Sequence, residues 1–530
     1  MRRSIPPRAA GRIVRAAAAL VTACAFAVLG ACDAGSSPGS GQGAQQGPGS
    51  AGGGVDVAAE NQKPGAAGWQ PVESALGPQD AIEGYTDLAS VAPGQSFRLY
   101  VSTTASSFTA TAYRVGYYGG ADATQVWQSP KTTGVHQTAQ SINGSTHTVE
   151  CQWQPSLTVA TAGWVPGEYL IKLASSSGNQ RYVPLIVHST STAGKIVILA
   201  GITTWQAYNA WGGYSLYHGP DGGYASRAYA VSFDRPYLDP DEPEGDGLFF
   251  PFDQALVSFA EQHDLPVAYE TDLELQTSPQ LFDGARAIVS DGHDEYYSAT
   301  MRTTLQDARD RQGTNLAFLG ANAIFRHIRW GSTALGPNRL VICYKQADID
   351  PLYSSDPSDT TQDWRFPPDS RPENALTGSL YQCNPVDAPY VVYDPGSWIF
   401  AGTGVAKGTS FPGLVGPEYD RVVDIATTPH PIDVLSHSPL TCKGTASAQE
   451  SSYYTTPSGA GVFDAATMRW ECALGSECAS HFGGPARDFV RRATLNLLTA
   501  FQQGPAGHAH PATDNTAGDH VPLGEGLGED

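Results

Sequence analysis

The sequence is poor in charge, and above all in positive charge. Only 16% of its 530 residues are charged, and 31 Lys and Arg stand against 52 Asp and Glu, which gives a formal net charge of −21 at pH 7. A surface with this excess of acid repels phosphate backbones and anionic lipid headgroups. The composition therefore excludes a nucleic-acid-binding protein that relies on a basic face.

The sequence also lacks an apolar run long enough to span a membrane at its N-terminus. The run at residues 16–31 has 16 residues, whereas a spanning helix needs about 20. It follows five arginines and ends in Leu29–Cys32 (LGAC), which resembles the lipobox of bacterial lipoproteins. We therefore predict a lipoprotein signal peptide at 1–31 and lipidation of Cys32, with an ordinary secretory signal as the alternative.

Aromatic residues are missing from the segment that follows. Residues 33–68 are rich in Gly, Ser, Gln and Ala, a composition that cannot bury a core. We predict a disordered tether at 32–69 that holds the protein on a bacterial cell surface, at the outer face of the membrane. Contact with the membrane would then occur only through the lipid anchor.

The sequence has few cysteines, and an even number of them is left to form disulfides if the protein is exported. Eight cysteines become six when Cys24 leaves with the signal peptide and Cys32 carries lipid. An even number in an exported protein predicts three disulfides, in 15 conceivable connectivities. None of the spacings fits a zinc finger, and the pair around Gly475 is close enough to bond locally. The disulfide candidates are Cys151, Cys343, Cys383, Cys442, Cys472 and Cys478.

Residues 70–190 show almost no helical periodicity. Alternating apolar segments such as 96–103 and 168–174 are separated by turn signals such as Asn143-Gly144. Several short strands at this spacing are typical of an antiparallel β-sandwich. We predict an immunoglobulin-like sandwich over this region.

The pattern changes near residue 194. Continuous apolar runs at 196–200 and 287–290 are typical of strands covered on both faces, and helical patterns follow them. This alternation predicts an α/β domain with a parallel sheet at 194–502, and therefore an α+β multidomain protein. The Gly-, Pro-, His- and Asp-rich end, 503–530, is predicted to be disordered.

Ligands of open parallel sheets collect at the carboxyl ends of the strands. Two segments meet this condition: 203–217, which is rich in Tyr and Trp, and 291–297, in which His293, Asp294 and Glu295 follow one another. One interpretation is a catalytic cluster. The other is a pair of carboxylates that face a helix dipole, worth about 0.3–1 kcal/mol each, beside aromatic residues that serve as core or as a glycan-stacking surface.

At these residues the sequence resembles a known family, the C-terminal region of the N,N-dimethylformamidase large (β) subunit and its relatives. The resemblance covers roughly residues 80–500, in order. The stretches that carry it are Tyr113–Gly120 (YRVGYYGG), Tyr208–Tyr217 (YNAWGGYSLY), Ser232–Tyr237 (SFDRPY), Tyr269–Leu273 (YETDL), Ser290–Ser298 (SDGHDEYYS), Asn315–Asn322 (NLAFLGAN) and Phe400–Arg421 (FAGTGVAKGTSFPGLVGPEYDR).

The resemblance implies a β-sandwich followed by an α/β domain similar to class I glutamine amidotransferases without their cysteine. It also implies a mononuclear ferric ion, a hard Lewis acid suited to phenolate and carboxylate oxygens. The metal ligands that it indicates are Glu295, Tyr208 and Tyr237, with Tyr217 as the competitor. The catalytic residues that it indicates are His293, as acid–base partner, and Asn322 and Glu418, which would orient substrate or water.

The function that we expect is metal-dependent hydrolysis of C–N bonds in small linear amides. The alternative is a non-catalytic surface protein that binds a glycan or a peptide through an aromatic cleft. The family's characterised enzyme pairs a large chain with a small one, so an accessory subunit and a homo-oligomer both stay open as partners.

Overall fold

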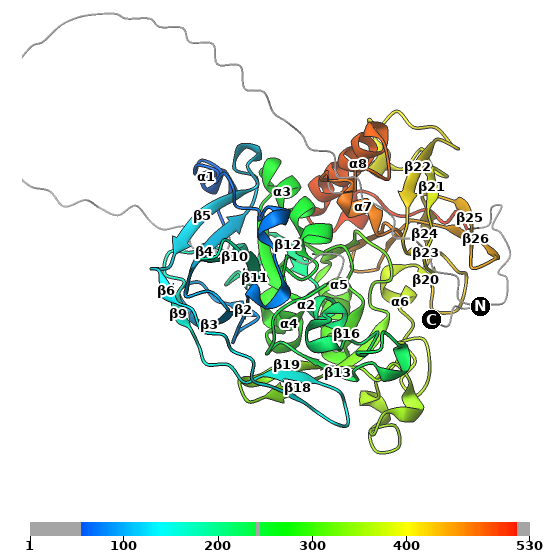
Figure 1. The fold of residues 1–530 in the computed structure, drawn as a ribbon. Coiled ribbons are helices and arrows are strands. Elements are labelled where there is room, and N and C mark those ends of the chain that lie inside the picture. The colour runs from blue at the N-terminus through cyan, green and yellow to red at the C-terminus, as the bar shows by residue number, and fades with distance from the viewer. Residues whose placement is uncertain (1–54, 240–243, 477, 517–530) are drawn as a thin grey trace, which may run out of the picture. The chain divides into compact units, whose positions relative to one another are not determined.

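The computed structural model describes residues 55–239, 244–476 and 478–516 (Figure 1). The predicted signal peptide and the lipidation site Cys32 lie outside the described residues. None of the helices in the described ranges is both long and apolar enough to cross a membrane.

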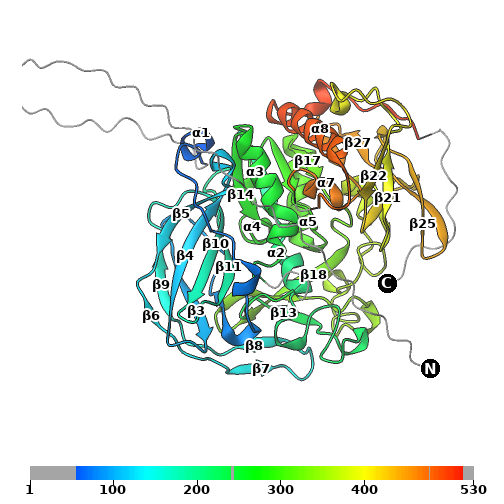
Figure 2. The ribbon, with the colours of Figure 1, turned by 45° about the horizontal axis from the view of Figure 1, so that its top comes forward.

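Two antiparallel sheets share one apolar core in the first third of the fold (blue to cyan in Figure 2). The first sheet has the order β1-β3-β9 and the second the order β2-β11-β10-β4-β5, with β6 beside β4. Among the described strands of these two sheets, β2 and β11 are the pair that runs in parallel. The strands are β1 (Ile82–Thr86), β2 (Ser90–Val91), β3 (Ser96–Thr103), β4 (Ser107–Val115), β5 (Ala123–Gln128), β6 (Thr132–Thr133), β9 (Leu157–Ala160), β10 (Gly167–Ser175) and β11 (Gln180–Val187), and a separate hairpin joins β7 (Gln140–Ile142) to β8 (Val149–Cys151).

A seven-stranded sheet forms the centre of the second region, in the order β14-β12-β15-β17-β28-β27-β24. The first five strands are parallel, and β27 and β24 complete the sheet in antiparallel pairings. This confirms the prediction of a mixed α+β protein. The strands are β12 (Ile196–Ala200), β14 (Val267–Thr271), β15 (Ala287–Ser290), β17 (Asn315–Phe318), β24 (Ile432–Val434), β27 (Ser452–Thr455) and β28 (Gly461–Asp464).

The helices follow the central strands in the order that the sequence indicates. Ser298 caps α5 by accepting a hydrogen bond from Met301 N (3.2 Å), and Gly313 ends this helix at φ 71°. The last helix packs its apolar face on β12 and β15. The longer helices are α2 (Ile202–Tyr208), α3 (Gln254–Gln262), α4 (Asp272–Thr277), α5 (Ala299–Gln312) and α8 (Gly484–Gln502), and the short ones are α1 (Val57–Glu60), α6 (Asn374–Thr377) and α7 (Arg469–Cys472).

Smaller sheets surround the central one. A four-stranded sheet has the order β13-β19-β18-β16, and three two-stranded sheets are β20–β23, β21–β22 and β25–β26. Their strands are β13 (Ala230–Ser232), β16 (Tyr296–Ser298), β18 (Arg326–Thr333), β19 (Gly336–Ile342), β20 (Leu380–Cys383), β21 (Ala388–Val391), β22 (Ser410–Val415), β23 (Tyr419–Arg421), β25 (Ser438–Cys442) and β26 (Thr445–Gln449).

Two disulfides are formed, Cys383–Cys442 and Cys472–Cys478. The expectation of three is wrong, because Cys151 and Cys343 are free thiols buried in separate parts of the fold. Buried free cysteine packs as a small apolar side chain. Burial raises the pKa of the Cys343 thiol to about 11, so this thiol stays protonated at neutral pH.

The ends of the described chain are held by contacts that their composition does not reveal. In residues 55–69, Trp69 is buried and Glu60 accepts a hydrogen bond from Tyr118 Oη at 3.0 Å. In residues 503–516, the His510 ring stacks on Trp398 with ring centres 4.2 Å apart. Both segments, assigned by composition to the tether and to the tail, are therefore part of the fold.

Candidate functional site

Two neighbouring strands deliver the candidate residues to the same edge of the central sheet. β12 leads into α2, which ends at Tyr208, and β15 leads into the loop that carries His293 and Glu295. Because β12 and β15 pair in parallel, their carboxyl ends meet. The turn after α2 then brings Tyr217 back to the same place.

Two glycines let the loops after β15 and β17 pack closely. Gly292 has φ 53°, and a Cβ there would lie 2.4 Å from Phe252 Cβ. A Cβ on Gly320 would lie 1.6 Å from the carbonyl oxygen of Gly292. The resulting turn separates Asp291, which faces Glu471, from His293, which faces Tyr208.

The Glu295 carboxylate is the centre of the site. Tyr217 Oη donates a hydrogen bond to Glu295 Oε2 at 2.7 Å, and Tyr208 Oη lies 3.4 Å from the same oxygen. Arg326 Nε donates to the other oxygen, Oε1, at 3.1 Å. Glu295 is 1% exposed, so one of its oxygens is held by a guanidinium and the other faces two phenols.

His293 lies beside the same phenols. Its Nε2 is 3.0 Å from Tyr208 Oη and 3.5 Å from Glu295 Oε2, whereas its Nδ1 is buried and has no hydrogen-bond partner among the described residues. The ring of Phe252 lies 6.0 Å from the imidazole, centre to centre. Tyr208, Tyr217 and Phe252 are half-buried, whereas His293 and Glu295 are buried.

A second group of polar side chains completes the site. Asn384 Nδ2 donates to Glu418 Oε1 at 3.0 Å and to Tyr381 Oη at 2.9 Å. Burial raises the pKa of Glu418, while His293 and a hydrogen bond from Asn322 oppose the rise. The structure therefore brings the expected residues His293, Asn322 and Glu418 to one place.

The hydroxyl groups around Glu295 resist ionisation. Burial raises the pKa of Tyr208, Tyr217 and Tyr296 well above 10, and the negative charge of Glu295 raises each of them further. Lys345 Nζ lies 3.2 Å from the centre of the Tyr217 ring, a cation–π contact that adds positive charge beside the phenols. The phenols stay protonated unless a cation compensates the loss of their protons.

The structure places Tyr237 away from this cluster. Its ring lies against Trp205, 6.3 Å between centres and nearly perpendicular, and its hydroxyl bonds with the Gln206 side chain. Arg235 holds the preceding turn by donating to main-chain carbonyls, including that of Asn209 at 2.9 Å. Tyr237 and its competitor Tyr217 were the alternatives for the second phenol ligand. Within the described structure, Tyr217 contacts Glu295 and Tyr237 does not.

The helix-dipole interpretation of residues 293–295 does not agree with the structure. A strand, β16, separates these residues from α5, whose first turn is capped by Ser298. Asp294 points inward and accepts a hydrogen bond from Ser290 Oγ at 2.9 Å. The carboxylate of Glu295 therefore faces the tyrosines and not a helix terminus.

Several residues of the site carried no signal in the sequence. Arg326 begins β18 and Lys345 follows β19, and both strands belong to a region with little periodicity. Tyr296 Oη donates a hydrogen bond to Tyr217 Oη at 2.7 Å. The sequence feature that could have indicated a role for Tyr296 is its position next to Glu295. The hydrogen-bonded pair Asn384 and Tyr381 comes from a proline-rich segment.

Comparisons with known proteins place this arrangement in a family. No curated protein matches the chain. Among solved structures, a cycloisomaltooligosaccharide glucanotransferase from Paenibacillus sp., complexed with cycloisomaltoheptaose, is 14% identical over 22% of this chain and 15% of its own, with a TM-score of 0.14. Residues 109–481 match the family model described as N,N-dimethylformamidase beta subunit-like, C-terminal. This match spans more than half of the chain and the whole cluster around Glu295, and the protein therefore belongs to the N,N-dimethylformamidase β-subunit-like family.

Proposed function

We propose that the protein is a metal-dependent hydrolase of C–N bonds in small linear amides, with its site at Glu295. Membership of the dimethylformamidase-like family supports amide hydrolysis. The observation that carries the proposal is the convergence of two phenol groups, from Tyr208 and Tyr217, on one carboxylate oxygen of Glu295.

The donor set fits a hard cation. Three oxygen donors, the two phenol hydroxyls and Glu295 Oε2, meet at one place, and His293 Nε2 lies beside them, 3.0 Å from Tyr208 Oη. Arg326 already neutralises the other side of Glu295. Phenolate and carboxylate oxygens are the ligands that ferric iron prefers, so we assign Tyr208, Tyr217 and Glu295 as the residues that would hold a mononuclear ferric ion. When bound, such an ion supplies Lewis acidity to an amide carbonyl and makes water a usable nucleophile near neutral pH.

The protein's own residues supply the proton chemistry. Hydrolysis adds water to the carbonyl carbon and breaks the C–N bond, and the nitrogen must gain a proton to leave as an amine. His293 Nε2 is the group in position to accept a proton from water and return it to the nitrogen, a role worth about 10²–10⁴-fold in rate. Glu418, held by Asn384 and Asn322, orients the imidazole and the substrate.

We also propose export and a lipid anchor at Cys32. The two disulfides support an oxidising, extracytoplasmic compartment. A small amide is the substrate that the buried site favours, because Glu295 and His293 are at most 3% exposed.

Metal content and colour test the proposal without knowledge of the substrate. Phenolates bound to ferric iron give a visible charge-transfer band. We expect wild-type protein to be tinted and to contain about one iron per chain, and Glu295→Gln to lose both the colour and the metal while its circular dichroism spectrum is unchanged. Colourless, iron-free wild-type protein, or a Glu295→Gln variant that keeps its iron, would overturn the proposal and favour a non-catalytic binding protein.

A further inference from the structure

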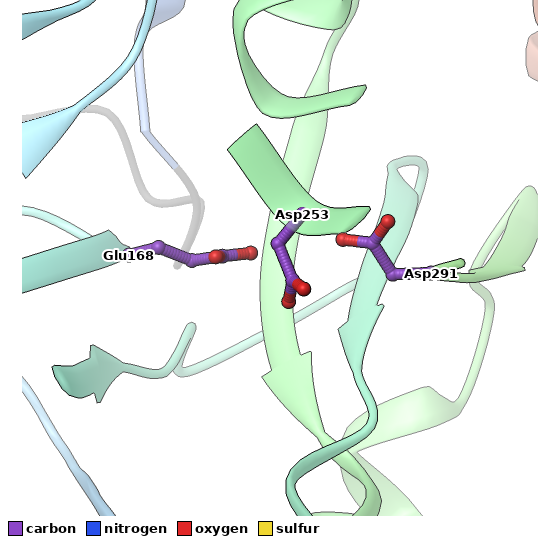
Figure 3. Close-up of side chains that lie close together, drawn as sticks. All are labelled: Glu168, Asp253 and Asp291. Carbon is purple, nitrogen blue, oxygen red and sulfur yellow. The ribbon is translucent and has the colours of Figure 1, made fainter. Parts of the chain in front are cut away.

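A second group of acidic side chains lies outside the site at Glu295. Glu168 comes from β10, Asp253 directly precedes α3, and Asp291 follows β15. One carboxylate oxygen from each lies within 4.8 Å of the other two, and all three residues are at most 2% exposed. Figure 3 shows the three carboxyl groups turned toward one another from three separate segments.

These carboxyl groups lack the partners that buried acids normally have. Among the described residues, both oxygens of Glu168 and Oδ1 of Asp253 have no hydrogen-bond partner, and the side chain of Asp291 is paired with another carboxyl group, that of Glu471. The nearby guanidinium of Arg114 is engaged elsewhere, because its Nη2 bonds Glu261 at 2.5 Å. Buried charge without compensation is costly, by several kcal/mol per ion.

A fourth carboxyl group, on a different element, is aimed at the same place. Glu471 of α7 is fully buried; its Oε2 accepts a hydrogen bond from the Gly292 main-chain N–H, and its side chain also pairs with the carboxyl group of Asp291. Its side chain faces Asp291. Glu471 thus places a fourth buried carboxyl group beside the three that lie close together.

We propose that Glu168, Asp253 and Asp291, supported by Glu471, bind a calcium ion. The donor set consists of oxygen alone, which suits a hard cation. Ca²⁺ accepts six to eight oxygen ligands in a flexible geometry, whereas Mg²⁺ requires a near-ideal octahedron and usually keeps several waters, so a buried group of carboxylates from separate segments suits Ca²⁺ better. One cation removes the mutual repulsion of all the carboxylates at once.

The position of this site gives it a structural role. Glu168 belongs to the antiparallel β region, and Asp291 begins the loop that carries His293 and Glu295. A bound ion therefore ties that loop to the neighbouring sheet and fixes the direction of the turn at Gly292. This role does not depend on whether the site at Glu295 hydrolyses amides.

Thermal unfolding and metal analysis of the full protein test the proposal. After treatment with chelator, CaCl₂ is expected to raise the melting temperature by about 5 °C or more, in a saturable way that EGTA reverses. Calcium should be found at one ion per chain, counted separately from iron. No response to calcium in the wild-type protein, or an equal response to MgCl₂, would overturn the assignment.

Matched variants locate the ion. Glu168→Gln should abolish the response to calcium while its circular dichroism spectrum stays that of the wild-type protein. Glu270→Gln is the control, because Glu270 of β14 is also a buried acid, but its carboxylate pairs with His188 at 3.9 Å and does not belong to the cluster. It should keep the full response. A Glu168→Gln variant that responds like wild type overturns the proposal, and if that variant does not fold, calcium content and the titration of wild type decide.

Discussion

Tyr217 and Tyr237 were both candidates for the same metal-ligand position, yet of the two only Tyr217 contacts Glu295 in the described residues. The difference arises in the turn held by Arg235, whose guanidinium binds the carbonyls of Trp211, Tyr214 and Asn209. That turn commits Tyr237 to Trp205 and leaves the hydroxyl of Tyr217 to the carboxylate. The contribution of a tyrosine here depends on the acceptor that its hydroxyl reaches.

This difference gives a paired prediction at the scale of single residues. Tyr217→Phe removes one oxygen donor, so we expect it to lose the charge-transfer band and at least tenfold in iron affinity. Tyr237→Phe removes a hydroxyl that bonds Gln206 instead, and it should keep both. Visible absorption and iron content of the two purified variants provide the measurement. Loss of iron in Tyr237→Phe with retention in Tyr217→Phe would reverse the assignment of the ligands.

The sequence allowed us to predict the site residues that follow strand ends, but not the other residues of the site. Glu295 and His293 could be predicted because they directly follow a buried apolar strand. Arg326 and Lys345 could not, because they flank a hairpin whose place beside Tyr217 depends on long-range packing. Glu168 and Glu471 were equally hidden, since each is an isolated acid in its own segment and only the fold brings them together.

At the scale of elements, buried strands of the same sheet differed in how well they could be predicted from the sequence. β12 and β15 lie in the middle of the parallel sheet, covered on both faces, so they read as continuous apolar runs. β24, β27 and β28 have only three or four residues each, in a segment rich in Gly, Pro and aromatics. These strands are about as short as β15, but they lie in a region, residues 330–480, with little periodicity, so the sequence did not distinguish them from loops although they complete the same sheet.

The two disulfides provide a prediction at this scale. Cys383–Cys442 joins β20 to β25 across 59 residues, whereas Cys472–Cys478 spans 6. Because a cross-link mainly restricts the unfolded chain, loss of the long one should cost about 4 kcal/mol and loss of the short one about 2 kcal/mol. Urea unfolding of the Cys383→Ser/Cys442→Ser and Cys472→Ser/Cys478→Ser double variants measures this, and an equal or reversed order would contradict it.

At the scale of the whole molecule, the two regions are joined by a buried ion pair. Arg114 of β4 and Glu261 of α3 are both fully buried, and Tyr269 Oη donates to Glu261 at 2.7 Å. Removal of one partner of such a pair costs about 3–5 kcal/mol, because the other charge stays buried. The antiparallel β region and the central sheet are therefore expected to unfold together.

The predicted anchor also belongs to this scale. If Cys32 is lipidated, wild-type protein should partition with membranes after expression in a bacterial host, and Cys32→Ser should become soluble or keep its signal peptide. Cell fractionation with immunoblotting follows the change. Membrane partition that is the same in both proteins would exclude the anchor.

The order of strands in the central sheet has a consequence for biosynthesis. β17 takes its next neighbour, β28, from a segment more than a hundred residues further along the chain. While that segment is still inside the ribosome or a translocation channel, β17 presents an open, apolar edge, which is the kind of edge that recruits strands from other chains. The nascent protein therefore needs a chaperone, or a delay of folding, until residues 461–464 emerge, and a chain that ends before them should accumulate as aggregate.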